Sequence, residues 1–315
     1  MTDPIRTHDL TKSFGALTAV DRLSLTVRSG EIFGLVGPDG AGKTTTIRLL
    51  TSVLPPSFGD AWVAGAHVVR EAETVKEKIG YMSQRFGLYH DLTVSENIDF
   101  YADIYGVSRS VRNDRLPRLL AASNLAPFRK RLAGNLSGGM KQKLGLVCAL
   151  IHTPEVLFLD EPTNGVDPVS RRDFWQILYE LLRENVTIFL STAYLDEAER
   201  CSRLALMHHG RLVACGAPDE VKRLFREAIL ELRTPDPRAA ASVLRDALGP
   251  DSVNLFGDLI HLRAADPAAA SERARDLLAR ASIEIDSLRP VDPTLEDVLV
   301  SVLSADPGDS SHASP

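Results

Sequence analysis

The chain has 315 residues, 44% of them hydrophobic and 25% charged, a composition that excludes wholesale disorder and predicts about two domains. Thirty-six lysines and arginines against 42 aspartates and glutamates give a net charge of −6, which argues against broad nucleic-acid binding, so we expect no nucleic-acid partner. Three cysteines without a Cys-x-x-Cys pair predict neither a disulfide framework nor a zinc site, and they indicate a reducing, intracellular setting.

Neither a membrane span nor a secretory signal is expected. The longest apolar run, Leu144 to Ile151, is far below the roughly 20 residues that cross a bilayer. The first residues, MTDPIRTHDL, lack the basic start and apolar stretch of a signal peptide. A protein of this kind would act on a membrane from the cytoplasmic side, through a partner.

The first two-thirds of the chain alternate apolar runs with helical patterns, which predicts an α/β fold with a mostly parallel sheet. Ile32–Val36 is predicted as a strand, followed by a glycine-rich turn and a helix over Thr44–Leu54. Val156–Leu159 and Thr187–Leu190 are apolar without alternation, as in strands that are buried on both faces. A helix-rich insertion is expected at about residues 85–151.

The pattern changes after about residue 224. Short strands and two helical patterns follow in a βαββαβ order, which predicts a small α+β domain over residues 225–304. The strands are Ile229–Leu232, Val253–Phe256, Ile260–Leu262 and Ile283–Ile285, and the helices are Arg238–Leu248 and Ala268–Ala281. Residues 305–315 are rich in Ser, Asp and Pro, so a disordered tail is expected.

A phosphate-binding loop is the sharpest motif, because residues 37–44 match G-x-x-x-x-G-K-[ST] between a strand and a helix. Glycines let successive backbone N–H groups point at phosphate oxygens, and the helix N-terminus adds its positive dipole end. Lys43 would bridge the β- and γ-phosphates, and the Thr44 hydroxyl would bind Mg²⁺. The expected nucleotide-binding residues here are Gly37, Asp39, Gly40, Ala41, Gly42, Lys43, Thr44 and Thr45.

The second half of the site is expected where the buried strand at residue 156 ends in Asp160 and Glu161. Open α/β sheets bind ligands at the carboxyl ends of their strands. Asp160 would hold Mg²⁺, and Glu161 is the candidate to orient or deprotonate the attacking water.

Between these two motifs lies Leu136-Ser137-Gly138-Gly139-Met140, and here the sequence resembles the nucleotide-binding subunit of an ABC transporter, whose signature is LSGGQ. The resemblance runs from about residue 5 to 224 and implies a P-loop NTPase (RecA-like) core with a helical signature subdomain, in a domain over residues 1–224. Ser137 is also a good helix N-cap. The resemblance implies that Ser137, Gly138 and Gly139 bind the γ-phosphate held by a second cassette.

Three more residues match the family's pattern, each with an ordinary structural alternative. Phe14 lies where the family stacks a ring on adenine, although a core phenylalanine would look the same. Gln84 matches the glutamine that senses Mg²⁺ and water and that starts the insertion contacting the membrane partner; an ordinary loop glutamine is the alternative. Asp167 matches a loop that communicates across the dimer, or it is a simple turn residue.

Two residues depart from the family's pattern. Asp39 stands where asparagine is usual and adds a negative charge near the phosphates. Ala193 stands where a histidine normally contacts the γ-phosphate. Asp39 should weaken nucleotide binding modestly, whereas the missing histidine implies a site of reduced activity. Because of Ala193 we expect this chain to be the slower half of an asymmetric cassette pair. A homodimer in which Tyr194, Gln84 or a water covers the missing contact is the alternative.

The function implied by the likeness is ATP binding and hydrolysis, with ATP and Mg²⁺ as cofactors, at the cytoplasmic face of the membrane. Glu31-Ile-Phe-Gly34 and Asp292-Pro-Thr-Leu-Glu-Asp-Val298 resemble exporters of drug- and lipid-type substrates, which have separate integral membrane permeases. We expect the permease to dock on residues 85–89, through Phe86 and Tyr89. The alternative is a soluble regulatory ABC ATPase that acts on ribosomes or DNA.

Overall fold

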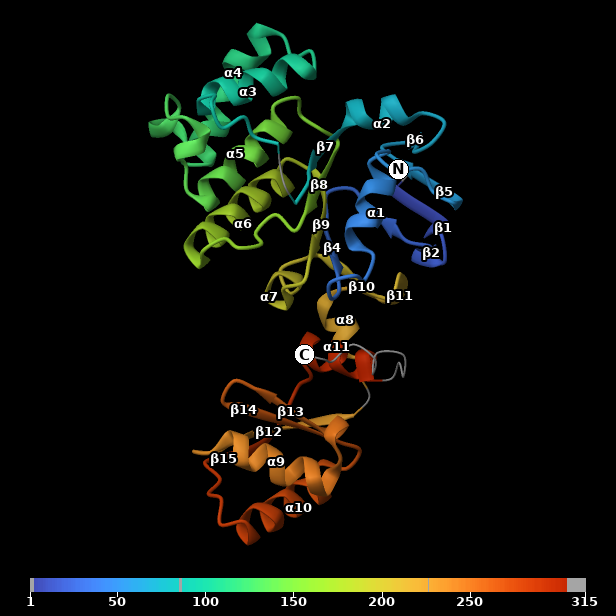
Figure 1. Cartoon of the computed structure of the whole chain (residues 1–315), viewed down its shortest axis with the longest axis vertical. Helices are drawn as coiled ribbons and strands as arrows, with labels where there is room; N and C mark the ends of the chain where they lie inside the picture. Colours follow the sequence, from blue (N-terminus) through green and yellow to red (C-terminus); the bar gives the residue numbers. More distant parts are fainter. Residues whose placement is uncertain (1–2, 85–86, 226, 305–315) are drawn as a thin grey trace. The chain divides into compact units, whose positions relative to one another are not determined.

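The computed structural model describes residues 3–84, 87–225 and 227–304, and the chain forms two compact units, residues 1–217 and 218–315 (Figure 1). The division therefore falls at Ala217, earlier than the expected boundary at 224, because helix α8 (Pro218–Lys222) contacts helix α11 (Leu295–Ser304) in the second unit. Arg85 and Phe86, at the start of the expected docking segment, and the expected tail lie outside the described residues.

A sheet with five parallel strands forms the centre of the first unit and confirms the expected α/β fold. The predicted strands are β4 (Ile32–Val36), β8 (Val156–Asp160) and β9 (Thr187–Thr192), and every residue in them is buried. Helices on both faces explain this apolar, non-alternating pattern. In the described residues the order is β11-β10-β4-β9-β8-β7, with β7 (Ile79–Met82) and β10 (Arg203–His208) parallel to their neighbours and β11 (Arg211–Gly216) antiparallel.

An antiparallel sheet that the sequence did not predict lies beside the central one. Its strands are β1 (Ile5–Phe14), β2 (Leu17–Leu23), β3 (Thr26–Val27), β5 (Phe58–Val63) and β6 (Ala66–His67). Helix α1 (Lys43–Leu50) contacts strands of both sheets. The helix ends at Leu50 instead of Leu54, because Ser52 takes a positive φ of 57° and two prolines follow at 55 and 56.

Helices form most of the rest of the first unit (Figure 1). Those between residues 94 and 150 share an apolar core of their own. Lys143 of α5 (Gly138–Leu150), the helix that follows Ser137, donates to Asp173 of α6 (Pro168–Arg183) at 2.7 Å and so ties the two helices together. The α-helices here are α2 (Ala72–Lys78), α3 (Val94–Ile104), α4 (Arg109–Ala122), α5 (Gly138–Leu150), α6 (Pro168–Arg183) and α7 (Leu195–Ala198). Among the described residues, no helix is long and apolar enough to span a bilayer.

The second unit has the expected βαββαβ order, with one error in the prediction. Its elements are β12 (Ala228–Arg233), α9 (Pro237–Leu248), β13 (Val253–Phe256), β14 (Leu259–Ala264), α10 (Pro267–Arg280) and β15 (Ser287–Val291), paired antiparallel as β13-β14-β12-β15. The strand expected at Ile283–Ile285 is wrong, because the last strand is β15. Ile283 and Ile285 pack against the apolar core without sheet pairing.

A buried ion pair stabilises the second unit. Asp297 of α11 is fully buried and accepts hydrogen bonds from His261 Nδ1 of β14 at 2.9 Å and from the backbone and hydroxyl of Thr294. The Asp297 carboxylate raises the pKa of His261 above its usual value despite burial. Burial opposes ionisation of Asp297, yet the hydrogen bonds from His261 and Thr294 hold its pKa below the usual value.

Candidate nucleotide-binding site

The glycine-rich loop between β4 and α1 can be built only with glycine at two positions. A Cβ added at Gly37 would lie 2.3 Å from the carbonyl oxygen of Met207, and one at Gly42 would lie 2.3 Å from that of Ala19. Gly42 also has a φ of +102°, which side-chain-bearing residues rarely adopt. The loop is therefore pressed between β10 and β2, so that its backbone is held in one conformation at the N-terminus of α1.

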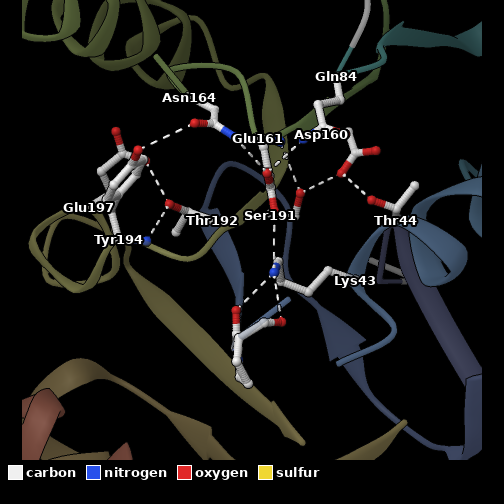
Figure 2. Close-up of polar contacts among 12 residues, drawn as sticks. Lys43, Thr44, Gln84, Asp160, Glu161, Asn164, Ser191, Thr192, Tyr194 and Glu197 are labelled. Atoms are coloured by element: carbon white, nitrogen blue, oxygen red, sulfur yellow. Dashed lines mark hydrogen bonds and ion pairs between the residues drawn. The ribbon is translucent and has the colours of Figure 1, made fainter. Parts of the chain in front are cut away.

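Lys43 is the buried cation of this loop. Its side chain is only 4% exposed, and Nζ donates to the carbonyl oxygens of Gly37 at 2.8 Å and Pro38 at 3.0 Å (Figure 2). The same ammonium lies 3.2 Å from Oε1 of Glu161. A buried ammonium needs such partners. The positive charge thus lies between the loop and the end of β8, where it suits a phosphate group.

Asp160 and Thr44 present adjacent oxygen atoms. Oδ1 of Asp160 accepts from the Thr44 hydroxyl at 3.1 Å and from the Ser191 hydroxyl at 2.7 Å (Figure 2). Burial at the end of β8 raises the pKa of Asp160, and the charge of Glu161 adds to this. Carboxylate and hydroxyl oxygens are the hard ligands that Mg²⁺ prefers, so the two residues fit a magnesium ion bound beside the loop.

Glu161 is held in a strained backbone conformation, with a φ of +47°. Its N–H donates to the hydroxyl and the carbonyl oxygen of Ser191 at 3.0 and 3.2 Å. Its Oε2 accepts from Gln84 Nε2 at 2.9 Å and from Asn164 Nδ2 at 3.2 Å. Strain of this kind at a carboxylate with three directed partners is typical of functional sites.

Lys43, Thr44 and Glu161 line one surface depression together with Phe14 and Gln84. Phe14 is 50% exposed, so its interpretation as a core phenylalanine is wrong, and its ring is free to stack on a base. The ammonium of Lys12 lies 5.2 Å from the ring centroid. The depression is lined by Phe14, Leu17, Ala19, Asp39, Gly40, Ala41, Gly42, Lys43, Thr44, Thr45, Gln84 and Glu161.

The signature residues lie elsewhere on the unit. Ser137 caps α5 by accepting from the backbone N–H of Met140 at 3.3 Å. A Cβ on Gly139 would lie 2.4 Å from Ser170, so this glycine permits close packing of α5 on α6. Asp167 caps α6 through the N–H of Ser170 at 2.9 Å, and these hydrogen bonds lower its pKa. Among the described residues that line the depression, none comes from Ser137 to Gly139 or is Asp167.

The two departures from the family pattern meet at a second, smaller cavity beside Glu161. Asp39 and Ala193 both line it, and Ala193 is exposed. Tyr194 and Asn164 complete the same wall, with Thr163 and Thr192. The two positions expected to depart from the family pattern thus put a carboxylate and a methyl group on the wall of one cavity.

Sequence reasoning missed Ser191 and Asn164. Ser191 ends the strand next to β8, so the rule that ligands bind at carboxyl ends of parallel strands could have identified it. Asn164 lies three residues after Glu161 in a turn, and no pattern in the sequence indicates that its amide points back at the carboxylate.

Comparison with known proteins gives matches in sequence. Residues 20–164 match the ABC transporter family. The probable multidrug ABC transporter ATP-binding protein YbhF of Escherichia coli is 51% identical over 200 residues, 64% of this chain and 35% of that protein. The daunorubicin/doxorubicin resistance ATP-binding protein DrrA of Streptomyces peucetius is 36% identical over 313 residues, 98% of this chain and 94% of that protein. The chain thus spans about a third of YbhF but nearly all of DrrA.

Solved structures agree in fold. An ATP-binding subunit of an ABC transporter is 32% identical, with a TM-score of 0.65 over 71% of this chain and 93% of that one. A dimeric cassette bound to ADP and phosphate is 23% identical, with a TM-score of 0.62 over 68% of this chain and 98% of that one, a likeness of fold alone. Both matches bear out the P-loop NTPase fold expected from the sequence. On these matches the chain belongs to the ABC transporter family, as one of its ATP-binding proteins.

Proposed function

We propose that this chain binds MgATP at the depression around Lys43 and hydrolyses it to drive export through a separate integral membrane permease. The observation that carries the proposal is the convergence of Lys43, Asp160 and Glu161 beside a glycine loop that admits no side chain at Gly37 or Gly42. The residues needed for phosphate, metal and water meet at one edge of the sheet.

Each residue has a distinct role in the proposed mechanism. The loop N–H groups and Lys43 hold the β- and γ-phosphates, and Phe14 stacks on the base. Thr44 and Asp160 would hold Mg²⁺, which neutralises phosphate charge when bound. Glu161 orients the attacking water and accepts its proton at a carboxylate oxygen. Gln84 also donates to Glu161, so it links that carboxylate to the segment that follows β7.

A second cassette completes the site. Ser137 and Gly138 lie outside the depression of their own chain, which supports a role toward the nucleotide of a partner cassette. Ala193 offers no donor to the γ-phosphate, and the loss of one such donor costs about 10²–10³ in rate. The chain is accordingly the slower half of an asymmetric pair, with a histidine-bearing cassette as its partner.

Exposed apolar side chains give the first unit a surface that suits a permease. Ile104 is 60% exposed and Val53 is 58% exposed, and both line a broad depression with Val111 and Tyr105. Tyr89 of the expected docking segment is 48% exposed. Contiguous exposed apolar side chains are typical of interaction surfaces. The permease places the chain at the cytoplasmic face of the membrane. The multidrug and daunorubicin/doxorubicin resistance proteins among its relatives favour a drug-like substrate, and the resemblance at residues 31–34 and 292–298 adds a lipid-like one.

Transport in inverted membrane vesicles tests this proposal. Vesicles that contain the tagged chain with its co-purifying membrane partner should accumulate a fluorescent amphiphilic drug when MgATP is added, and Lys43→Ala should abolish the uptake. Arg280→Ala, which removes one exposed positive charge from α10 of the second unit and lies outside both depressions, is the control and should leave uptake unchanged. Recovery of the chain with ribosomes or DNA, and with no membrane protein, would contradict the proposal.

A further inference from the structure

Tyr194 follows Ala193 in the chain. The side chain of Asn164 connects the Tyr194 hydroxyl to the carboxylate of Glu161 by two hydrogen bonds. The hydroxyl donates to Oδ1 of Asn164 at 3.3 Å, and Nδ2 of Asn164 donates to Oε2 of Glu161 at 3.2 Å (Figure 2). Three side chains from the two loops that follow β8 and β9 are thus joined in a line that ends on the carboxylate.

The polarity of this line is fixed by chemistry. An asparagine amide has one accepting end and one donating end. Glu161 is acceptor-only when ionised, so it requires the NH₂ end of Asn164. The Tyr194 hydroxyl can then donate to the remaining oxygen. The Asn164 amide satisfies both neighbours in one orientation only, and Tyr194 therefore selects the rotamer in which Asn164 points at Glu161.

Tyr194 is itself held from several sides. The guanidinium of Arg171 lies 4.4 Å from the centroid of its ring, and Arg171 pairs with Asp196 at 3.3 Å and with Glu197 at 3.5 Å. The backbone N–H of Tyr194 donates to the Thr192 hydroxyl at 3.0 Å, and that hydroxyl donates to the buried Glu197 at 2.8 Å. The ring is stacked and its backbone is anchored, so the hydroxyl has a defined place despite partial exposure.

We propose that Tyr194 is a positioning residue for ATP hydrolysis, which acts through Asn164 to hold Glu161 in the orientation that addresses the attacking water. Lys43 fixes one carboxylate oxygen, and Gln84 and Asn164 fix the other. Without the Tyr194 hydroxyl, the amide of Asn164 is free to turn away, and the carboxylate keeps Gln84 as its only neutral donor among these contacts. This inference rests on the proposed role of Glu161.

Tyr194→Phe keeps the ring on Arg171 and removes only the hydroxyl. We expect kcat to fall about two- to tenfold, the fold-change of one lost hydrogen bond, with KM and MgATP affinity unchanged. Tyr179→Phe is the matched control, because Tyr179 has the same 36% exposure and its ring packs on Trp175 of α6. That variant should keep the wild-type kcat.

A double-mutant cycle with Asn164→Ala tests whether Tyr194 acts on the hydrolysis rate through Asn164 or independently of it. If Tyr194 acts through Asn164, the double variant should be no slower than Asn164→Ala alone. Additive losses, a change in KM with unchanged kcat, or a Tyr194→Phe rate equal to that of Tyr179→Phe would overturn the inference. Glu161→Gln is measured in parallel. If this variant hydrolyses ATP at the wild-type rate, the role proposed for Glu161 fails. If Glu161→Gln loses hydrolysis but Tyr194→Phe keeps the wild-type rate, only the positioning role of Tyr194 is refuted.

Discussion

Ala193→His should restore the missing contact and raise the rate of ATP hydrolysis by the isolated chain. Ala193 is exposed and lines the small cavity beside Glu161, so an imidazole at this position meets open space instead of packed core. Its cost in stability should stay within about 0.5 kcal/mol, as for other surface substitutions. One added donor toward developing phosphate charge is worth about 10²–10³ in rate.

Because of Asp39, we expect the increase in hydrolysis rate caused by Ala193→His to lie in the upper part of that range. Its carboxylate lines the same cavity, and a negative charge nearby favours the protonated, more strongly donating form of an introduced imidazole. The gain in rate from Ala193→His should therefore be smaller in an Asp39→Asn background, measured against Asp39→Asn alone, than in the wild type.

The assay is steady-state release of phosphate from MgATP by the purified chain, beside Ala121→His as a histidine added at an exposed alanine of α4. Only the substitution at 193 should raise the rate. Robust turnover by the wild type that Ala193→His fails to increase would refute the argument that the missing histidine limits this site, and with it the asymmetric pair.

Further predictions concern binding, packing and pH. Lys43→Ala should weaken MgATP binding by about tenfold or more in calorimetry, because a charge-assisted contact is lost, whereas Lys76→Ala should bind normally; equal affinities would count against the assigned site. Gly139→Ala should lower the free energy of unfolding by about 1–3 kcal/mol, because its Cβ would lie 2.4 Å from Ser170 on α6. Gly138→Ala is the control and should unfold like the wild type, because a Cβ there has nothing within 4 Å. Similar losses in both variants would refute the packing argument. The raised pKa of His261 means that its pair with Asp297 contributes fully below the unfolded pKa of about 6.5 and is lost as pH rises through the folded value. Because the pKa of Asp297 is lowered, the contribution of the pair is lost again when strong acid protonates this carboxylate. The free energy of unfolding that Asp297→Asn removes should therefore be greatest on the acid side of pH 6.5 and decline above it. A loss that grows as the pH rises would contradict this sign.

The parts of the fold that depend on a local sequence pattern could be predicted from the sequence. Continuous apolar runs and motif spacing can be recognised without tertiary information. They were therefore enough to predict the glycine loop and the buried strands β4, β8 and β9. Ile283 and Ile285 show the limit of this reasoning, because apolar loop residues that pack on a core and apolar residues in a strand look alike in a short run.

The finer geometry of the site depends on long-range packing. Ser191 reaches both Asp160 and Glu161 only because β9 pairs with β8. Asn164 and Tyr194 lie 30 residues apart and meet through the loops that follow those strands. Phe14 and the loop at Gly40 are likewise brought to one depression by the pairing of β1 and β2 beside α1.

The central claim is that Glu161 serves hydrolysis at a site where Lys43 and Thr44 hold MgATP. The most direct measurement compares MgATP affinity and single-turnover hydrolysis in the wild type and in Glu161→Gln, which has nearly the same shape without the charge. The account predicts that affinity stays within about twofold and that the hydrolysis rate falls by at least about 10²-fold. Hydrolysis by Glu161→Gln at the wild-type rate, with MgATP bound equally well, would contradict it.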